Sequence, residues 1–280
     1  METLIPTRLA TLGHPHRLAI FRLLMRRYPD RVSAGEIAQA LDLKPSTLSS
    51  YLSSLMQAGL IDQTREGTSL RYAIAMTEVQ RTFDYLLLDC CRGRPELCSS
   101  TPLPKMENPP MSDQKYKVLF ICTGNSARSI FAESILRHEA GDRFEAHSAG
   151  TRPRSELNPF ALEVLERKGH DISVLRAKNV AELQGADAPR FDFVFTVCDR
   201  AANEDCPSWP GQPISAHWGM PDPVKAEGTD AQKSLAFQQS YGALANRIRA
   251  FAALPIASLD RISLQRAVDD LARTGAGEPA

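Results

Sequence analysis

Cys122 and Arg128 bound a short loop with the residue types of an oxyanion-binding nucleophile. The loop follows the apolar run 117–121 and precedes a segment, 129–140, that is predicted to be helical. Inward-facing backbone amides next to a helix N-terminus form an anion site. The same field is expected to lower the pKa of Cys122, which makes its thiolate available near neutral pH. The planar Arg128 guanidinium can hold two oxygens of a tetrahedral anion.

Other residues of this loop suit the same purpose. Ser129 can donate a hydrogen bond to the cysteine sulfur, Asn125 can brace the loop, and Gly124 permits close backbone approach. A loop of this kind can hydrolyse phosphate esters, reduce an oxyanion or only sense one. The predicted oxyanion-binding positions are Thr123, Gly124, Asn125, Ser126, Ala127 and Ser129.

Length and composition indicate a globular chain with more than one domain. The 280 residues suffice for two cores, and 43% hydrophobic with 24% charged residues are ordinary globular values. No apolar run approaches membrane-spanning length, and the N-terminus lacks a signal-peptide layout, so we expect a cytoplasmic protein. In that reducing compartment the six cysteines favour metal binding or redox chemistry over structural disulfides.

A segment rich in proline and small polar residues separates two unlike halves. Residues 98–114 contain four prolines and show no hydrophobic period, which is typical of a linker. We predict domains at 1–98 and 116–253, a linker at 99–115, and a helical extension and tail at 254–280.

The first half has the element order of a winged helix-turn-helix. Helices are predicted at 17–27, at 33–41 behind a Ser33–Glu36 capping box, and at 45–58, where Gly59 ends the helix. Two strands about a Glu66–Gly67 turn span 60–74, and a last helix covers 77–91. Leu48, Leu52, Leu55 and Met56 are expected to form the buried face of the third helix, and Val79, Phe83, Leu86 and Leu87 one side of the last.

The outward face of helix 45–58 is predicted to read DNA. Short hydroxyl side chains there can approach phosphates and base edges in a major groove, and arginines that flank the hairpin turn can reach the backbone of the adjacent minor groove. Residues 1–75 contain nine Lys/Arg against six Asp/Glu, a balance compatible with nucleic acid. A small helical domain with a solvated serine-rich face is the alternative. The predicted DNA-binding residues are Ser46, Thr47, Ser49, Ser50, Tyr51, Arg65 and Arg71.

The segments "LATLGHPHRLAIFRLL", "AGEIAQALDLKPSTLSSYLSSLMQAGLI" and "REGTSLRYAI" resemble the ArsR/SmtB family of metal- and metalloid-responsive repressors over about residues 5–98. The resemblance implies a homodimer, formed through the N-terminal domain, that binds an inverted-repeat operator. Many arsenical repressors have cysteines on the helix before the recognition helix, whereas helix 33–41 has none.

Three thiols stand instead in "LLLDCCRGRPELC", at Cys90, Cys91 and Cys98. Structural zinc prefers four tetrahedral ligands, whereas As(III) is satisfied by three thiolates in a pyramid. The pattern resembles the C-terminal arsenite site of some ArsR/SmtB members, so we expect As(III) as inducer. A redox pair, another soft metal and inert cysteines are the alternatives.

The second half alternates strands with helices, which predicts an α/β domain with a parallel sheet. Strands are expected at 117–121, 144–148 and 191–198. Helices are expected at 129–140, 158–168 and 229–253, followed by an amphipathic helix at 258–273.

The loop, together with "HSAGT" (147–151) and Asp222–Pro223, resembles the low-molecular-weight tyrosine phosphatases over about residues 116–253. Asp222 matches the acid that protonates the leaving oxygen in that family. "TVCDRAANEDCPSWP" further resembles the thioredoxin-coupled arsenate reductases. By that resemblance Cys122 attacks arsenate, Cys198 attacks Cys122 and frees arsenite, and Cys206 attacks Cys198. Thioredoxin or another thiol system is the implied reductant, and no tightly bound cofactor is expected.

Two departures from these families bear on the chemistry. Ala127 stands where many relatives have a cysteine, which excludes a protective disulfide within the loop. The aromatic residue that often follows Asp222–Pro223 in the phosphatases is missing, which counts against a phosphotyrosine substrate. The favoured interpretation is an As(III)-responsive repressor fused to an arsenate reductase. A phosphatase fused to a regulator and a pure oxyanion sensor are the alternatives.

Overall fold

The computed structural model describes residues 4–91, 115–184, 188–204 and 209–274. The chain divides into two compact units, Met1–Lys105 and Met106–Ala280, and each is described by itself. Cys98, Cys206 and the predicted linker, except Lys115, lie outside the described residues. None of the helices in the described ranges is long and apolar enough to cross a bilayer.

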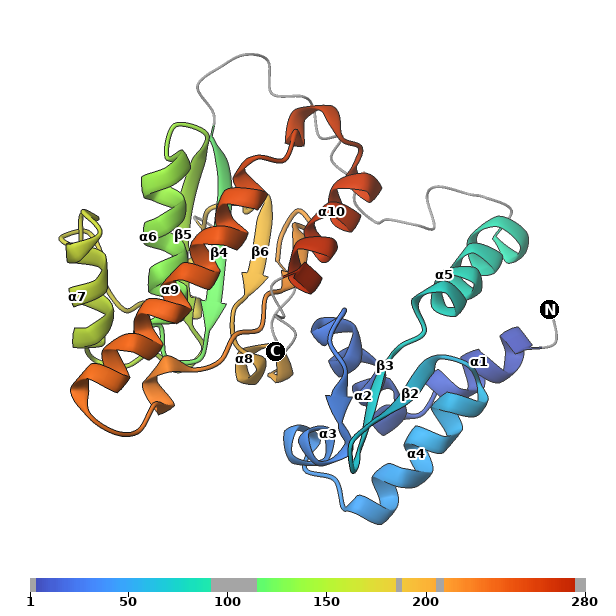
Figure 1. The fold of residues 1–280 in the computed structure, drawn as a ribbon. Helices are drawn as coiled ribbons and strands as arrows, with labels where there is room; N and C mark the ends of the chain where they lie inside the picture. The colour runs from blue at the N-terminus through green and yellow to red at the C-terminus, as the bar shows by residue number, and fades with distance from the viewer. Residues whose placement is uncertain (1–3, 92–114, 185–187, 205–208, 275–280) are drawn as a thin grey trace. The chain divides into compact units, whose positions relative to one another are not determined.

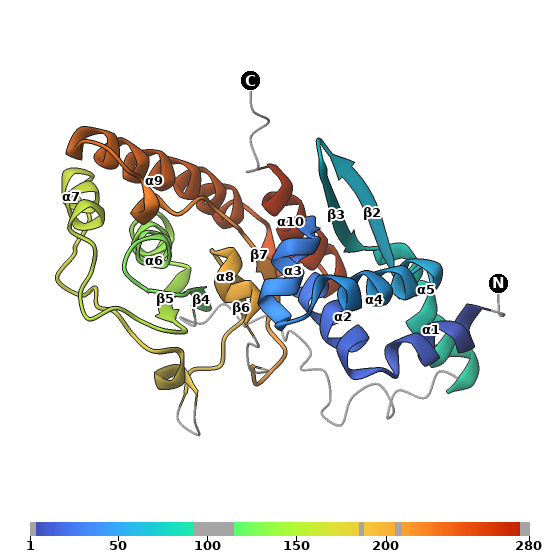
Figure 2. The same ribbon diagram turned by 90° about the horizontal axis from the view of Figure 1, so that it is seen from below.

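The N-terminal unit is a helical domain with a small antiparallel sheet (Figure 1). Its strand order is β1-β3-β2, and the β2–β3 hairpin projects from the helices in Figure 2. The elements are α1 (Leu4–Leu12), α2 (Pro15–Arg27), β1 (Val32–Ser33), α3 (Ala34–Leu41), α4 (Pro45–Gln57), β2 (Ile61–Glu66), β3 (Ser69–Ile74), α5 (Met76–Tyr85) and a π-helical turn η1 (Leu86–Cys90).

Helix α4 buries Leu48, Leu52 and Leu55 as predicted, whereas Met56 is only half-buried. The helix ends where Gly59 adopts a positive φ of 67°. Ser33 caps α3 by accepting from the Glu36 amide. The Glu36 carboxylate pairs with the buried Arg27 guanidinium, which ties α3 to α2.

The last predicted helix is not uniform. Its α-helical part ends at Tyr85, and the chain continues as a π-helical turn to Cys90. Val79 is buried, but Phe83 is 48% exposed and Leu86 and Leu87 are half-buried. Among the described residues of this unit, the expected apolar side of the helix is therefore covered at Val79 but not at Phe83.

The C-terminal unit is an α/β domain whose four-stranded parallel sheet has the order β5-β4-β6-β7. Its elements are β4 (Tyr116–Cys122), α6 (Arg128–Ala140), β5 (Phe144–Gly150), α7 (Pro159–Arg167), η3 (Val180–Leu183), β6 (Phe193–Thr196), α8 (Asp199–Asn203), β7 (Ile214–His217), η4 (Pro223–Lys225), α9 (Asp230–Ala252), η5 (Ile256–Ser258) and α10 (Arg261–Thr274). Strand β7 and helix α8 are additional to the predicted elements, and β6 is shorter than predicted because Cys198 already caps α8.

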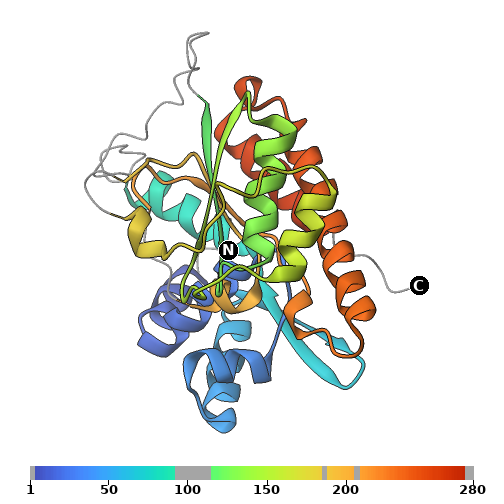
Figure 3. The same ribbon diagram turned by 90° about the vertical axis from the view of Figure 1, so that its left-hand side faces the viewer.

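Helices α6, α7 and α9 pack against one another on one face of the sheet, as Figure 3 shows. Residues 129–136 of α6 are all buried, because the helix lies between the sheet and α9. An aromatic cluster fixes this layer: Trp218 stacks on Phe195 with ring centroids 4.0 Å apart, and Phe251 of α9 meets both rings edge-on. The start of α6, where the nucleophilic loop ends, therefore lies in the packed interior of the domain.

Candidate active site

Strand β4 delivers Cys122 to the carboxyl edge of the sheet, and the loop 123–127 leads directly into α6. The thiol is buried, with 3% of the residue exposed. Ser129 Oγ lies 2.9 Å from Cys122 Sγ, and the backbone amide of Asn125 donates to the same sulfur at 3.1 Å. The predicted contact from Ser129 is thus present, and the loop directs polar hydrogens at the sulfur.

Asn125 braces the loop from inside, in the left-handed backbone region at φ 43°. Its side-chain amide nitrogen donates to Ser129 Oγ at 2.9 Å and to Ser148 Oγ at 2.8 Å. Its oxygen accepts from the backbone amide of Lys178 at 2.7 Å. The bracing role predicted for Asn125 therefore has a geometric basis in three contacts from three segments.

The segment 150–158 covers the outer side of the loop through its backbone. The amides of residues 151, 152, 154 and 158 donate to the carbonyl oxygens of Cys122, Thr123, Gly124 and Ser126, at 2.9 to 3.1 Å. These bonds keep the carbonyls turned outward. With the carbonyl oxygens held on the outer side, backbone N–H groups of the loop can point inward and donate to a bound anion.

Arg128 lies beside Asp222, the predicted general acid. One guanidinium nitrogen of Arg128 is 3.0 Å from Asp222 Oδ2, and another donates to the Met220 carbonyl at 3.0 Å. The other carboxylate oxygen, Asp222 Oδ1, accepts from the Val224 amide at 3.3 Å, which fixes the carboxylate at the start of η4. The predicted anion-binding cation and the predicted acid therefore meet at the loop.

The second thiol of the predicted relay lies at the same edge of the sheet. Cys198 follows β6, the neighbour of β4, and is 1% exposed. Its sulfur lies 3.5 Å from Thr123 Oγ1 and accepts from the Ala201 amide at 3.4 Å. Thr123 thus links the nucleophilic loop to the second thiol.

The predicted lowering of the Cys122 pKa is wrong as a net effect. Burial raises the pKa of the Cys122 thiol, and the nearby Cys198 adds to this increase. Three influences oppose this increase and lower the pKa of Cys122: the hydrogen bond with Ser129, the charge of Arg128 and the hydrogen bond from the Asn125 backbone amide. The physical reason is desolvation, because the thiol lies under the loop rather than at an open helix end.

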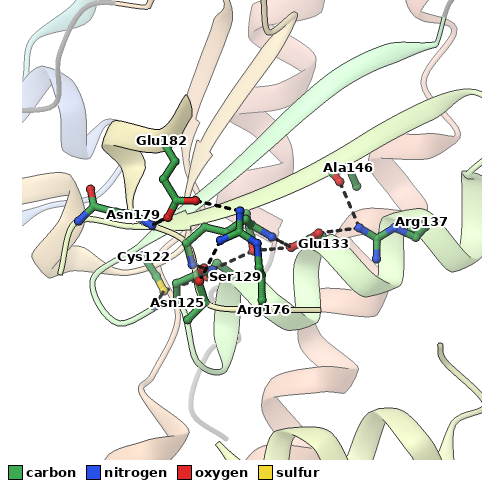
Figure 4. Close-up of polar contacts among 12 residues, drawn as sticks. Cys122, Asn125, Ser129, Glu133, Arg137, Ala146, Arg176, Asn179 and Glu182 are labelled. Carbon is green, nitrogen blue, oxygen red and sulfur yellow. Dashed lines mark hydrogen bonds and ion pairs between the residues drawn. The ribbon is translucent and has the colours of Figure 1, made fainter. Parts of the chain in front are cut away.

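A buried charged network supports the loop from behind, and the sequence had not indicated it. Glu133 of α6 is 3% exposed and accepts from Ser148 Oγ, while Lys178 Nζ lies 3.0 Å from its carboxylate. Arg137 pairs with the other carboxylate oxygen. Figure 4 shows how the contacts run from Cys122 through Ser129 and Asn125 toward Glu133. The signal in the sequence was a single acidic residue among the apolar and small residues of 129–136.

The predicted DNA-binding residues belong to the other unit. Ser46, Thr47, Ser49 and Ser50 are exposed on α4, and Arg65 is exposed on the hairpin. Tyr51 does not point freely outward, because its ring packs against those of His14 and His16. Arg71 pairs with Glu66 at 2.7 Å and donates to the Arg31 carbonyl. Tyr51 and Arg71 are thus less available to DNA than predicted.

Two family models match the chain. One, described as low molecular weight phosphotyrosine protein phosphatase, matches residues 117–263. The chain belongs to this phosphatase family. The other, described as helix-turn-helix domain, matches residues 12–64. The phosphatase-family domain is thus preceded by a helix-turn-helix domain.

The relatives of this phosphatase-family domain include arsenate reductases. The arsenate reductase of Shouchella clausii is 38% identical over 136 residues, which cover 48% of this chain and 94% of that protein. A thioredoxin-dependent arsenate reductase from Corynebacterium glutamicum matches in structure with 23% identity and a TM-score of 0.36, over 77% of this chain and 90% of that one. An ArsR-like transcriptional regulator from a Rhodococcus species matches with 21% identity and a TM-score of 0.30, over 35% of this chain and 89% of that one. The family models and the curated relatives confirm that a helix-turn-helix domain is joined to a domain of this family, and they confirm the predicted enzyme class, arsenate reductase.

Replacing Ser129 by alanine is expected to raise the pKa of Cys122 further, because one of the influences that lower it is removed. The pKa is expected to rise because the thiolate accepts the hydrogen bond from Ser129 more strongly than the thiol does, so removing this bond destabilises the thiolate. Alkylation of Cys122 by iodoacetamide, followed by mass spectrometry of its peptide from pH 5 to 10, should show a midpoint at higher pH in Ser129→Ala. Ser134→Ala, on the same helix but in contact with His170, is the control. An unchanged midpoint in Ser129→Ala would contradict the assigned contact.

Replacing Gly150 by alanine is expected to deform the oxyanion loop. A Cβ at this position would lie 2.8 Å from the Thr123 carbonyl oxygen and 3.0 Å from Asn125 Cβ. Binding of inorganic phosphate or arsenate, measured by titration calorimetry, should weaken by about 10- to 100-fold, the equivalent of one charge-assisted hydrogen bond. Gly242→Ala in α9, where a Cβ meets nothing within 4 Å, should bind the anion normally. Equal anion affinities in the two variants would show that the close approach is unimportant.

Proposed function

We propose that the C-terminal unit reduces arsenate to arsenite by a cysteine relay, and that the N-terminal unit is a cytoplasmic repressor released by As(III). The observation that carries the enzymatic half is the position of Cys198. A phosphatase needs one thiol at the loop, whereas reduction needs a second thiol that can reach the first. The contact between Thr123 Oγ1 and Cys198 Sγ supports the second scheme.

The proposed first step forms a bond between Cys122 sulfur and arsenic. The thiolate attacks arsenate held by the loop amides and Arg128, and Asp222 protonates the oxygen that leaves as water. The Arg128–Asp222 pair supports this assignment, because the residue that binds the anion also holds the acid beside it. Loss of the contacts that position Cys122 in the loop would slow this step most, because its rate depends on the orientation of the nucleophile.

The proposed second step transfers two electrons. The Cys198 thiolate attacks Cys122 sulfur, the sulfur–arsenic bond breaks, and its electron pair remains on arsenic as arsenite. Cys206 then attacks Cys198, which frees Cys122 and leaves a Cys198–Cys206 disulfide. A dithiol protein such as thioredoxin reduces this disulfide and completes the cycle.

The proposed repressor acts as a homodimer on an inverted-repeat operator. Leu4 and Leu9 of α1, Phe83 of α5 and Leu88 of η1 are between 42% and 70% exposed, an apolar set that a second copy could cover. The exposed hydroxyls of α4 would then contact the two half-sites.

Metalloid release completes the proposed circuit, in which the product of one unit is the inducer of the other. Cys90 is exposed and Cys91 half-buried at the end of η1, and the two would bind As(III) together with Cys98. Binding there changes the spacing of the two recognition helices, so operator affinity falls.

The enzymatic half is tested with arsenate, NADPH, thioredoxin and thioredoxin reductase. NADPH oxidation should require arsenate and fall at least about a thousandfold in Cys122→Ser, Cys198→Ser and Cys206→Ser, because each removes a bond-forming atom. Cys90→Ser, which lies outside the relay, is the matched control. In a parallel assay, hydrolysis of p-nitrophenyl phosphate that needs only Cys122, without arsenate-dependent oxidation, would support a phosphatase instead.

The regulatory half is tested by fluorescence anisotropy with a DNA duplex that the wild-type protein selects from a random library. Arsenite should release wild-type protein but not Cys90→Ser, Cys91→Ser or Cys98→Ser. Cys122→Ser should still respond to arsenite but not to arsenate with the thioredoxin system. Release of all three sensor variants by arsenite would refute the proposed site.

A further inference from the structure

Arg8 is a buried cation that the DNA-reading and enzymatic roles do not explain. It stands on α1, yet only 4% of the residue is exposed. A buried guanidinium is costly unless each of its groups is paired. The contacts that satisfy it join three helices of the N-terminal unit.

One contact reaches the end of the recognition helix. Arg8 Nε donates to the carbonyl oxygen of Ala58, the C-cap of α4, at 3.0 Å. Gly59 follows with its positive φ, and a Cβ there would lie 3.4 Å from Arg8 Nη2. The guanidinium therefore lies against the point where α4 stops.

The remaining contacts reach α5. Arg8 Nη1 donates to the Glu78 carbonyl at 3.1 Å and to Thr82 Oγ1 at 3.0 Å, and Nη2 lies 2.6 Å from the Glu78 carboxylate. Thr82 is itself buried and donates to the Glu78 carbonyl at 2.7 Å. Arg8 thus holds two consecutive turns of α5 through a backbone oxygen, a hydroxyl and a carboxylate.

Helix α5 continues without a break into η1, which ends at Cys90. A displacement at the cysteine end is therefore passed along the helix to Thr82 and Glu78. Because Arg8 bonds both to these residues and to Ala58, α5 cannot shift against α4 without carrying the end of α4 or breaking these bonds.

We infer that Arg8 is a positioning residue that couples α5 to the recognition helix α4. A change at the Cys90–Cys91 end of α5 then alters the orientation of α4 and with it the affinity for DNA. The last step of this inference rests on the proposed function, whereas the coupling of the two helices does not.

The coupling is tested first without any metalloid, in the full chain. Asp89→Pro breaks the last turn of the α5–η1 helix, beyond the Arg8 contacts. Hydrogen exchange of the peptide 52–60, which ends at the α4 terminus, should accelerate at least about fivefold in Asp89→Pro. When Asp89→Pro is introduced into the Arg8→Met protein, it should accelerate hydrogen exchange of this peptide by less than about twofold. Equal acceleration in both backgrounds, or none with Arg8 present, would overturn the inference.

Matched variants separate coupling from loss of fold. Arg81→Met removes another cation that pairs with Glu78, but Arg81 is exposed and makes this pair within α5 itself, so the coupling should persist. Arg8→Lys keeps a buried charge but cannot reach Ala58, Glu78 and Thr82 together, so the coupling should fall even where Arg8→Met is poorly folded. Circular dichroism melts establish which variants are folded.

The consequence for DNA is tested with the selected duplex. Arsenite should weaken binding by wild type and Arg81→Met at least about tenfold, and by Arg8→Lys and Arg8→Met less than about threefold, with equal arsenite uptake. A full arsenite response in folded Arg8 variants would overturn the inference. If wild type ignores arsenite while the exchange experiment shows coupling, the proposed inducer is wrong and the role of Arg8 stands.

Discussion

The active-site loop depends on one buried amide side chain, that of Asn125. Its nitrogen and oxygen connect the start of α6, the end of β5 and the segment before η3. Because Asn125 is fully buried, a lost bond would leave a polar group without its partner. The left-handed backbone that Asn125 adopts is held by these three contacts, and it is this backbone that directs the residue's amide at Cys122.

The buried carboxylate of Glu133 lies behind the Asn125 side chain. Its negative charge is compensated by neighbouring cations, so α6 can contain an acidic residue beneath the loop. Glu133 fixes Ser148, which in turn receives Asn125, while Lys178 and Arg137 balance the carboxylate. Lys178 also gives its backbone amide to Asn125, so one residue supports the loop directly and through the carboxylate. The site therefore consists of the loop, which binds the anion, and the Glu133 network, which supports the loop. Of the two, the loop has a recognisable sequence pattern.

The sequence predicted the parts of the molecule that local rules determine. Apolar periods and turn residues located most helices and strands, and the Cys122–Arg128 spacing located the loop. What it missed depends on contacts between distant segments. The short strand β7 has only four residues, Glu133 acquires its role through Lys178, 45 positions away, and Tyr51 turns from the DNA face because two histidines pack on it. The Cys122 pKa was misjudged for the same reason, since burial is a property of the whole fold.

The segment 150–158 supports the loop almost entirely through main-chain amides. A backbone bond does not depend on which side chain the donor residue bears, unless that residue is proline. Between Gly150, where a Cβ would meet the Thr123 carbonyl oxygen, and Asn158, whose side chain caps α7, these main-chain bonds therefore do not fix the identity of the donor side chains. The rim of the active site can therefore differ in its side chains at these donor positions while the backbone frame that holds the loop stays the same.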